Sequence, residues 1–129
     1  MNKRILYREL SDDIIKIAID VQKELGIGFL EKVYENAYAV RLFEENILFE
    51  QQKAIKVFFH SQIVGDYFAD LVIDNEIIIE LKAVEVLLPV HEVQTLTYMK
   101  LADMRLGYLI NFNVPLIKQG IKRKINGYF

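Results

Sequence analysis

A short polar turn between two apolar segments is the feature that most constrains the fold of this 129-residue chain. The turn is Asp-Asn-Glu at residues 74–76, and it separates residues 63–73 from residues 77–82. Both flanking segments are rich in Ile, Val and Leu and have the length of ordinary strands. They therefore predict an antiparallel β-hairpin whose register is set by the turn.

A hairpin centred on this turn places Asp70 directly opposite Glu80, where paired Cβ atoms are about 4.5–5.5 Å apart. Lys82 lies on the same face as Glu80, because strand side chains alternate between the two faces of a sheet. The opposite face is entirely apolar and predicts a core surface, formed by Leu71, Ile73, Ile77, Ile79 and Leu81. Two carboxylates and an ammonium group therefore meet on the polar face of the hairpin.

The cluster of Asp70, Glu80 and Lys82 has two interpretations. Two adjacent carboxylates repel each other, and burying either of them without a partner costs several kcal/mol. One solution is a structural ion pair between Glu80 and Lys82, which leaves Asp70 to solvent. The other is a divalent cation bound by both acids, for which oxygen ligands favour Mg²⁺ or Mn²⁺ over zinc. The spacing alone leaves both interpretations open.

The rest of the chain predicts helices packed on a sheet. The first helix is expected to begin after Ser11 as N-cap and to end at Gly26. A second helix is expected over residues 30–46, with an apolar stripe of Leu30, Val33, Ala37 and Val40. Further strands are expected at residues 55–59, 106–112 and 121–125, and a third helix over residues 90–102 after Pro89. The order ααβββαβ(β) indicates one α/β domain over residues 1–129.

Composition excludes several classes of chemistry. The chain has no cysteine, which excludes thiol catalysis, Cys-ligated zinc and disulfide bonds. A net charge of −2 argues against a protein that coats nucleic acid through a large basic surface, but not against an acid-lined site. No apolar run is long enough to cross a bilayer and the polar start is not a secretory signal, so a cytoplasmic protein is expected.

Motifs along the chain resemble those of a known nuclease superfamily. Asp70, Glu80 and Lys82 form a D-x9-E-x-K pattern similar to the Asp…Glu-x-Lys core of the PD-(D/E)xK nuclease superfamily. Gln94 and Tyr98 match the Q-x-x-x-Y motif of its RecB-like exonuclease branch. The resemblance implies a restriction-endonuclease-like core, in which a mixed β-sheet is flanked by α-helices.

An upstream motif narrows the resemblance to one family within that superfamily. The segment GFLEKVY at residues 28–34 reads G-x-x-E-x-x-Y and looks like the bacterial GxxExxY protein family. The similarity extends over roughly residues 26–125. Ala69 departs from the superfamily pattern, whose name has proline at this position, although only the following aspartate takes part in the chemistry.

The resemblance implies a Mg²⁺ or Mn²⁺ site. Asp70 and Glu80 would be metal ligands, and the main-chain carbonyl of Leu81 would be a third. Glu31 would reach over from the second helix to complete the metal site, and Glu35, one turn further along, is the second choice for this role.

The same resemblance implies a metal-dependent nuclease that hydrolyses phosphodiester bonds in DNA or RNA. Lys82 would orient or activate the attacking water and steady the charge that develops on the phosphate. Gln94 and Tyr98 would support the site from one face of the third helix.

The expected partner is a nucleic acid substrate, with DNA favoured over RNA, and a homodimer is considered by analogy with other small nucleases. The basic residues near the C-terminus are expected to form a solvated edge: Lys118, Lys122, Arg123 and Lys124. The alternative function is a non-catalytic module that keeps the nuclease fold and binds nucleic acid or a protein partner.

Overall fold

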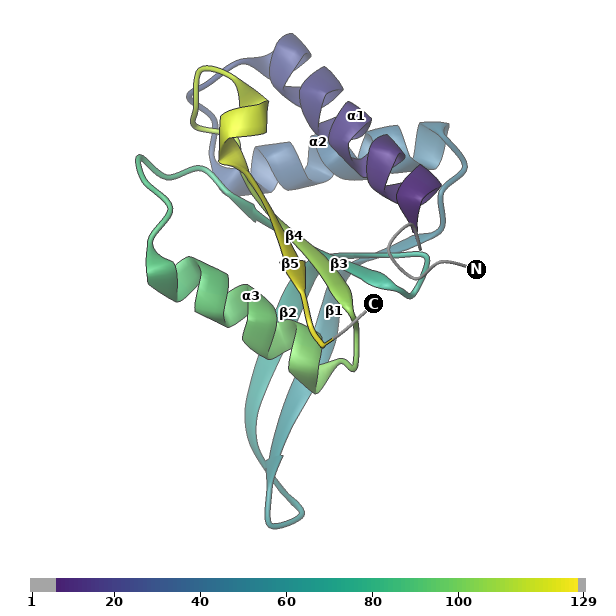
Figure 1. Ribbon diagram of the computed structural model, residues 1–129, viewed down its shortest axis with the longest axis vertical. Coiled ribbons are helices and arrows are strands. Elements are labelled where there is room, and N and C mark those ends of the chain that lie inside the picture. Colours follow the sequence, from purple (N-terminus) through teal and green to yellow (C-terminus); the bar gives the residue numbers. More distant parts are fainter. Residues whose placement is uncertain (1–6, 128–129) are drawn as a thin grey trace.

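Within residues 7–127, which the computed structural model describes, the chain forms one five-stranded sheet and three α-helices (Figure 1). The elements in chain order are α1 (Arg8–Leu25), α2 (Glu31–Glu44), β1 (Phe49–Phe59), β2 (Gln62–Ile73), β3 (Ile77–Lys82), α3 (Pro89–Leu101), β4 (Leu106–Asn111), the short 3-10 helix η2 (Ile117–Gly120) and β5 (Ile121–Ile125). The strand order is β1-β2-β3-β4-β5, with β3 and β4 parallel and the other neighbours antiparallel. The predicted mixed sheet flanked by helices is confirmed.

The helices cover both faces of the sheet. α1 and α2 pack together on one face and α3 lies on the other (Figure 1). β3 is buried along nearly its whole length because it lies in the middle of the sheet with helices on both sides. The five residues predicted to form the core surface of the hairpin all belong to the core beneath α1 and α2, while Ile78 packs beneath α3.

The β2–β3 hairpin has the predicted register. Its backbone pairs are Leu71 with Ile79, Val72 with Ile78, and Ile73 with Ile77. Asp74 and Asn75 in the turn have φ angles of 52° and 55°. Two consecutive left-handed residues are typical of a type I′ turn, and short Asp and Asn side chains tolerate this conformation. The local sequence of the turn therefore determines which residues of β2 and β3 face each other.

The β1–β2 hairpin is longer than predicted and extends beyond the rest of the sheet (Figure 1). The prediction that this strand begins at residue 55 is wrong, because β1 begins at Phe49. Residues 50–54 are mostly polar and lack a strand pattern of their own. They are strand because they pair with the inner half of β2, which belongs to the buried part of the sheet.

Two helix predictions are also corrected. α1 begins at Arg8, one turn before Ser11, so Ser11 lies inside the helix and is not its N-cap. The apolar stripe predicted for α2 is wrong, since Leu30 is 80% exposed and Val40 is 58% exposed. The buried face instead carries Tyr34 and Tyr38, together with Ala39 and Leu42. Large aromatic side chains bury more apolar area than valine, so they determine which face of the helix turns inward.

α3 and the last two strands agree with prediction to within about one residue at each end. α3 starts at Pro89, where the missing N–H has no helical partner to lose. None of the helices described for residues 7–127 has a stretch apolar and long enough to span a membrane.

Candidate active site

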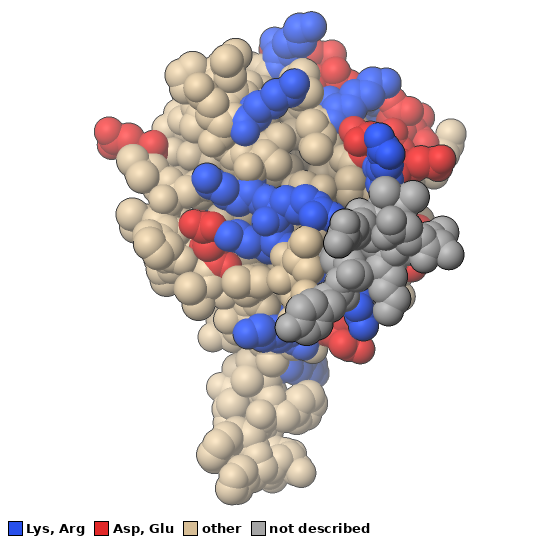
Figure 2. Space-filling model, in the orientation of Figure 1, with Lys and Arg blue, Asp and Glu red and all other residues tan. Residues whose placement is uncertain are grey.

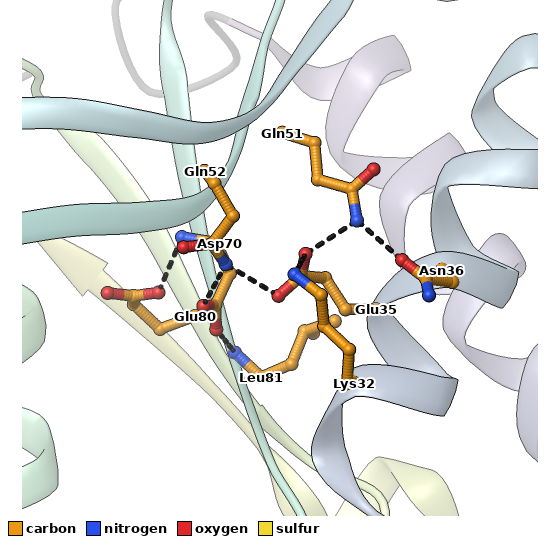
Figure 3. A network of polar contacts seen from close by, with 8 residues as sticks. All are labelled: Lys32, Glu35, Asn36, Gln51, Gln52, Asp70, Glu80 and Leu81. Carbon is orange, nitrogen blue, oxygen red and sulfur yellow. Dashed lines mark hydrogen bonds and ion pairs between the residues drawn. The ribbon is translucent and has the colours of Figure 1, made fainter.

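The candidate site lies where β2 separates from β3. Backbone pairing between the two strands ends at Leu71 and Ile79, so β3 continues beside β4 alone. The next residues, Asp70 and Glu80, are joined through their side chains instead. The Asp70 N–H donates to Glu80 Oε2 at 3.0 Å, and the Leu81 N–H donates to Asp70 Oδ2 at 2.8 Å (Figure 3). Each carboxylate thus satisfies a backbone donor that the parting strands leave free.

A cavity of about 110 Å³ next to these carboxylates brings the predicted side chains together. Its lining includes all six side chains proposed from the sequence, Glu31, Asp70, Glu80, Lys82, Gln94 and Tyr98, and adds Phe68, His91 and Thr95. The residues come from β2, β3, the first turn of α2 and most of the length of α3. Segments far apart in the sequence therefore converge on this one small polar cavity.

Glu80 is the most strongly perturbed group of the site. Glu80 is buried, with only 6% of its surface exposed. Burial, followed by the negative charge of Asp70, raises the pKa of Glu80 to about 9, against an ordinary 4.5. In the absence of a cation, Glu80 therefore holds a proton at neutral pH. A bound cation would favour the ionised form and relieve the repulsion between the two acids.

The oxygen atoms that line this part of the cavity would suit a hard divalent cation. Asp70 and Glu80 offer carboxylate oxygens to the same cavity. The N–H and C=O of a strand residue point to the same side, so the Leu81 carbonyl is directed, like its N–H, towards Asp70. An all-oxygen donor set is suited to Mg²⁺ or Mn²⁺.

Lys82 lines the cavity without an ionic partner among the residues that the structure describes. The structural ion pair between Glu80 and Lys82, one of the two interpretations of the cluster, is therefore not formed. The backbone around Lys82 is held firmly, because the Phe112 N–H donates to the Lys82 carbonyl at 2.9 Å. The buried Asn111 side chain also bonds both backbone groups of Val84. The backbone of Lys82 is thus fixed, whereas its ammonium group has no ionic partner within residues 7–127.

The two glutamates of α2 have different environments. Glu31 is exposed at the first position of the helix and lines the cavity. Glu35 is 4% exposed and accepts hydrogen bonds from Lys32, Gln51 and Gln52. Across residues 7–127, no three acidic or histidine side chains converge closely enough to form a metal cluster. Glu31 therefore borders the cavity without forming a three-carboxylate cluster with Asp70 and Glu80.

α3 contributes the other wall of the cavity. Burial, followed by the charge of Glu80, raises the pKa of the Tyr98 hydroxyl above its usual value. The Tyr98 ring also lies 5.3 Å from the ring of Tyr67, measured between centroids. His91 accepts a hydrogen bond from the Leu88 N–H on Nδ1 at 3.0 Å, which satisfies a free donor at the start of the helix. Gln94 is exposed at the rim of the cavity.

Sequence reasoning missed Gln52, which touches the site. Gln52 lies opposite Asp70, between the backbone pairs Gln51–Leu71 and Lys53–Ala69. Its Nε2 donates to Asp70 Oδ1 at 3.1 Å and to Glu35 Oε1 at 2.7 Å (Figure 3). The sequence predicted that this strand begins only at residue 55, so Gln52 lay outside the predicted strand and had no partner on the next strand. Extending the register of the β1–β2 hairpin inward would have identified the pairing.

The basic residues near the C-terminus lie away from the cavity lining. Lys122 and Arg123 are exposed on β5, and Lys124 forms an ion pair with Glu92 of α3. Figure 2 shows Lys and Arg side chains grouped over β5 in this view. Lys122 and Arg123 form the solvated edge expected from the sequence, and Lys118 is exposed on η2. Lys124 differs from the expectation, because it is half-buried in its ion pair.

Comparison with known proteins agrees with the geometry. Residues 8–124 match the family model described as the PD-(D/E)XK nuclease superfamily. The searches of curated proteins and of solved structures return no match. The mixed sheet flanked by helices is consistent with the restriction-endonuclease-like core of that superfamily. Since the match covers nearly the whole chain, the chain belongs to the PD-(D/E)XK nuclease superfamily.

Proposed function

We propose that the protein is a divalent-metal-dependent nuclease that hydrolyses phosphodiester bonds. The observation that carries this proposal is the composition of one cavity, in which Asp70 and Glu80 lie beside Lys82, whose ammonium group has no ionic partner within residues 7–127. Membership of the superfamily supports nuclease activity in general. The metal requirement, the substrate and the roles of individual residues are parts of the proposal.

Asp70, Glu80 and the Leu81 carbonyl would hold Mg²⁺ or Mn²⁺. Glu31 borders the same cavity from the first turn of α2 and would contribute a further oxygen. When bound, the cation would lower the pKa of a water molecule and polarise a phosphoryl oxygen. Asp70 and Glu80 would hold the cation in place, and Glu80 would lose its proton when the cation binds.

Lys82 would act on the phosphate and on the attacking water. Its ammonium group has no ionic partner among residues 7–127, so it is available to stabilise negative charge that develops on the phosphate. Gln94 and Tyr98 lie on the opposite wall and would position the substrate and the water.

We also propose the finer assignments that the motifs suggest. These are the GxxExxY family with its RecB-like Q-x-x-x-Y motif, a single domain over residues 1–129 and a cytoplasmic location. We further propose a nucleic acid substrate, with DNA favoured over RNA. A homodimer is the assembly to be tested by analogy.

A non-catalytic binding module is the second candidate function. Both carboxylate oxygens of Asp70 accept hydrogen bonds from the protein, one from Leu81 and one from Gln52. The raised pKa of Glu80 leaves that carboxyl neutral at neutral pH. The site is therefore electrostatically satisfied without a cation, as a module that has lost catalysis would require.

A cleavage assay with matched lysine variants separates the two functions. Single- and double-stranded DNA and RNA are incubated with the protein in Mg²⁺, in Mn²⁺ and in EDTA. We expect metal-dependent cleavage of at least one substrate and a loss of about 10²–10³-fold in rate for Lys82→Met, since a donor to developing charge is removed. Lys100→Met, an exposed lysine at the end of α3, is the control. Cleavage in EDTA, or equal rates for both variants, contradicts the proposed mechanism.

A further inference from the structure

Gln52 has an unusual backbone for a residue inside a strand. Its φ angle is 55°, in the left-handed region that side chains other than glycine rarely adopt. The flanking residues pair normally with β2, so the distortion is confined to this position. Local strain of this kind persists only where the surrounding structure enforces it, and it is common beside functional sites.

With this backbone conformation, the side chain of Gln52 contacts two carboxylates at once. Both of its hydrogen bonds are donated by Nε2, one to Glu35 and one to Asp70. The two partners are carboxylates, which accept hydrogen bonds when ionised, so the amide nitrogen rather than the amide oxygen faces them. A glutamate here would add a third acid, and an asparagine would be one methylene shorter.

Glu35 provides a rigid anchor for this amide. It is buried on α2 and also accepts hydrogen bonds from Lys32 at 2.9 Å and from Gln51 at 2.6 Å (Figure 3). α2 packs on the face of the sheet opposite α3, whereas Asp70 lines the cavity beneath α3. Gln52 thus connects a fixed acid on one side of the sheet to a carboxylate of the site on the other.

The carboxylate of Asp70 is held from two directions as a result. Gln52 donates to Oδ1 and the Leu81 N–H donates to Oδ2, which together determine the rotation of the carboxylate plane. Each oxygen retains a second lone pair for a further ligand. Groups that orient a metal ligand in this way contribute strongly to metal affinity.

From these contacts we propose that Gln52 is a positioning residue, which orients Asp70 for a divalent cation through a hydrogen-bond relay from Glu35. The proposal rests on the proposed metal-dependent function, because it requires that Asp70 binds the metal. It assigns no contact between Gln52 and the substrate. The competing explanation is that Gln52 only stabilises the junction of β1 with β2.

Glycine at this position separates the two explanations. Gln52→Gly removes the amide but favours the left-handed backbone, because glycine adopts positive φ without steric cost. A purely stabilising residue replaced in this way leaves metal affinity unchanged. A positioning residue leaves a folded protein with weakened metal binding.

The test is isothermal titration of the full chain with Mn²⁺, together with thermal denaturation in EDTA. We expect Gln52→Gly to keep the melting temperature of the wild type and to bind Mn²⁺ about 10–100-fold more weakly. Gln51→Ala is the matched control, since Gln51 bonds the same Glu35 and no atom of Asp70. Its affinity should equal that of the wild type. If Gln52→Gly does not fold, Gln52→Asn decides, because asparagine tolerates positive φ but cannot reach both acids.

The outcomes distinguish this inference from the function on which it rests. Wild-type affinity in the folded Gln52 variant overturns the positioning role and leaves the proposed nuclease intact. A wild-type protein that binds Mn²⁺ no better than Asp70→Asn overturns the metal site, and the positioning role with it. Mn²⁺ affinity that falls equally in the Gln51 and Gln52 variants also overturns the inference. Both side chains bond Glu35, so the loss would then come from disturbing Glu35 and not from the bond between Gln52 and Asp70.

Discussion

At the scale of single residues, the dominant feature of the site is the close approach of the carboxyl groups of Asp70 and Glu80. A hydrogen bond from the Asp70 N–H favours the ionised form of Glu80, and Lys82 favours it too. Burial and the charge of Asp70 outweigh both and raise the pKa of Glu80 to about 9. Without a cation, Glu80 is therefore neutral at neutral pH, and ionising it destabilises the folded state.

We expect the stability of the metal-free protein to fall as pH rises from about 4.5 towards about 9. The folded-state pKa of Glu80 lies above its ordinary value of 4.5, so the folded state binds more protons than the unfolded state in this window. The contribution is therefore fully present below about pH 4.5 and is lost as the pH passes the folded pKa. Urea denaturation in EDTA at a series of pH values measures this slope.

Glu80→Gln should flatten this pH dependence, because an amide has no proton to lose. Glu85→Gln, at an exposed position just after β3, should retain the wild-type slope and serves as the control. A Glu80→Gln protein with the wild-type slope would show that another group titrates in this range.

At the scale of secondary-structure elements, the close contact of α3 with the sheet holds the second wall of the cavity in place. Gly107 on β4 lies beneath this helix. A Cβ added at Gly107 would lie 2.7 Å from Met99 Sδ and 3.3 Å from the Ile78 carbonyl oxygen. Met99 is fully buried, so it has little space in which to move. The absence of a side chain at this position thus permits the approach of α3.

We expect Gly107→Ala to destabilise the protein by about 1–3 kcal/mol, the usual cost of overpacking a core. The same change should reduce activity, because Gln94 and Tyr98 move with the helix. Gly65→Ala is the matched control, since its Cβ would meet only Val57, at an ordinary 3.8 Å. Denaturant midpoints of the two variants measure the difference, and equal midpoints would show that α3 adjusts without cost.

At the scale of the whole molecule, the cavity lies where several elements meet. Its walls come from α2, from β2 and β3, and from α3, which belong to opposite faces of the sheet. The β1–β2 hairpin extends away from this centre, and β5 carries the basic edge (Figures 1 and 2). A cation bound in the cavity would therefore add a connection between elements that belong to opposite faces of the sheet.

We expect Mn²⁺ to stabilise the folded protein by about 2.7 kcal/mol at a concentration 100-fold above its dissociation constant. The reason is that a ligand bound only by the native state adds its binding free energy to that of folding. Melting curves with and without Mn²⁺ measure the effect. The double variant Asp70→Asn with Glu80→Gln should show no shift, whereas an equal shift would place the binding site elsewhere.

The central part of the site could be predicted from the sequence because it depends on local geometry. The turn at Asp74 and Asn75 determines the register of β2 and β3, and strand alternation then places Asp70, Glu80 and Lys82 on one face. The core surface of the same hairpin follows from the same alternation. Turn type and alternation require no knowledge of distant segments.

Tertiary structure alone decided the features that depend on segments distant in the chain. Residues 50–54 are strand only because β2 pairs with them, and α2 turns Tyr34 and Tyr38 inward because the sheet offers space for those rings. The relay from Glu35 through Gln52 to Asp70 joins a helix to two strands, and no local pattern marks it. Turn and alternation are properties of neighbouring residues, whereas burial and side-chain contacts depend on how the whole chain packs.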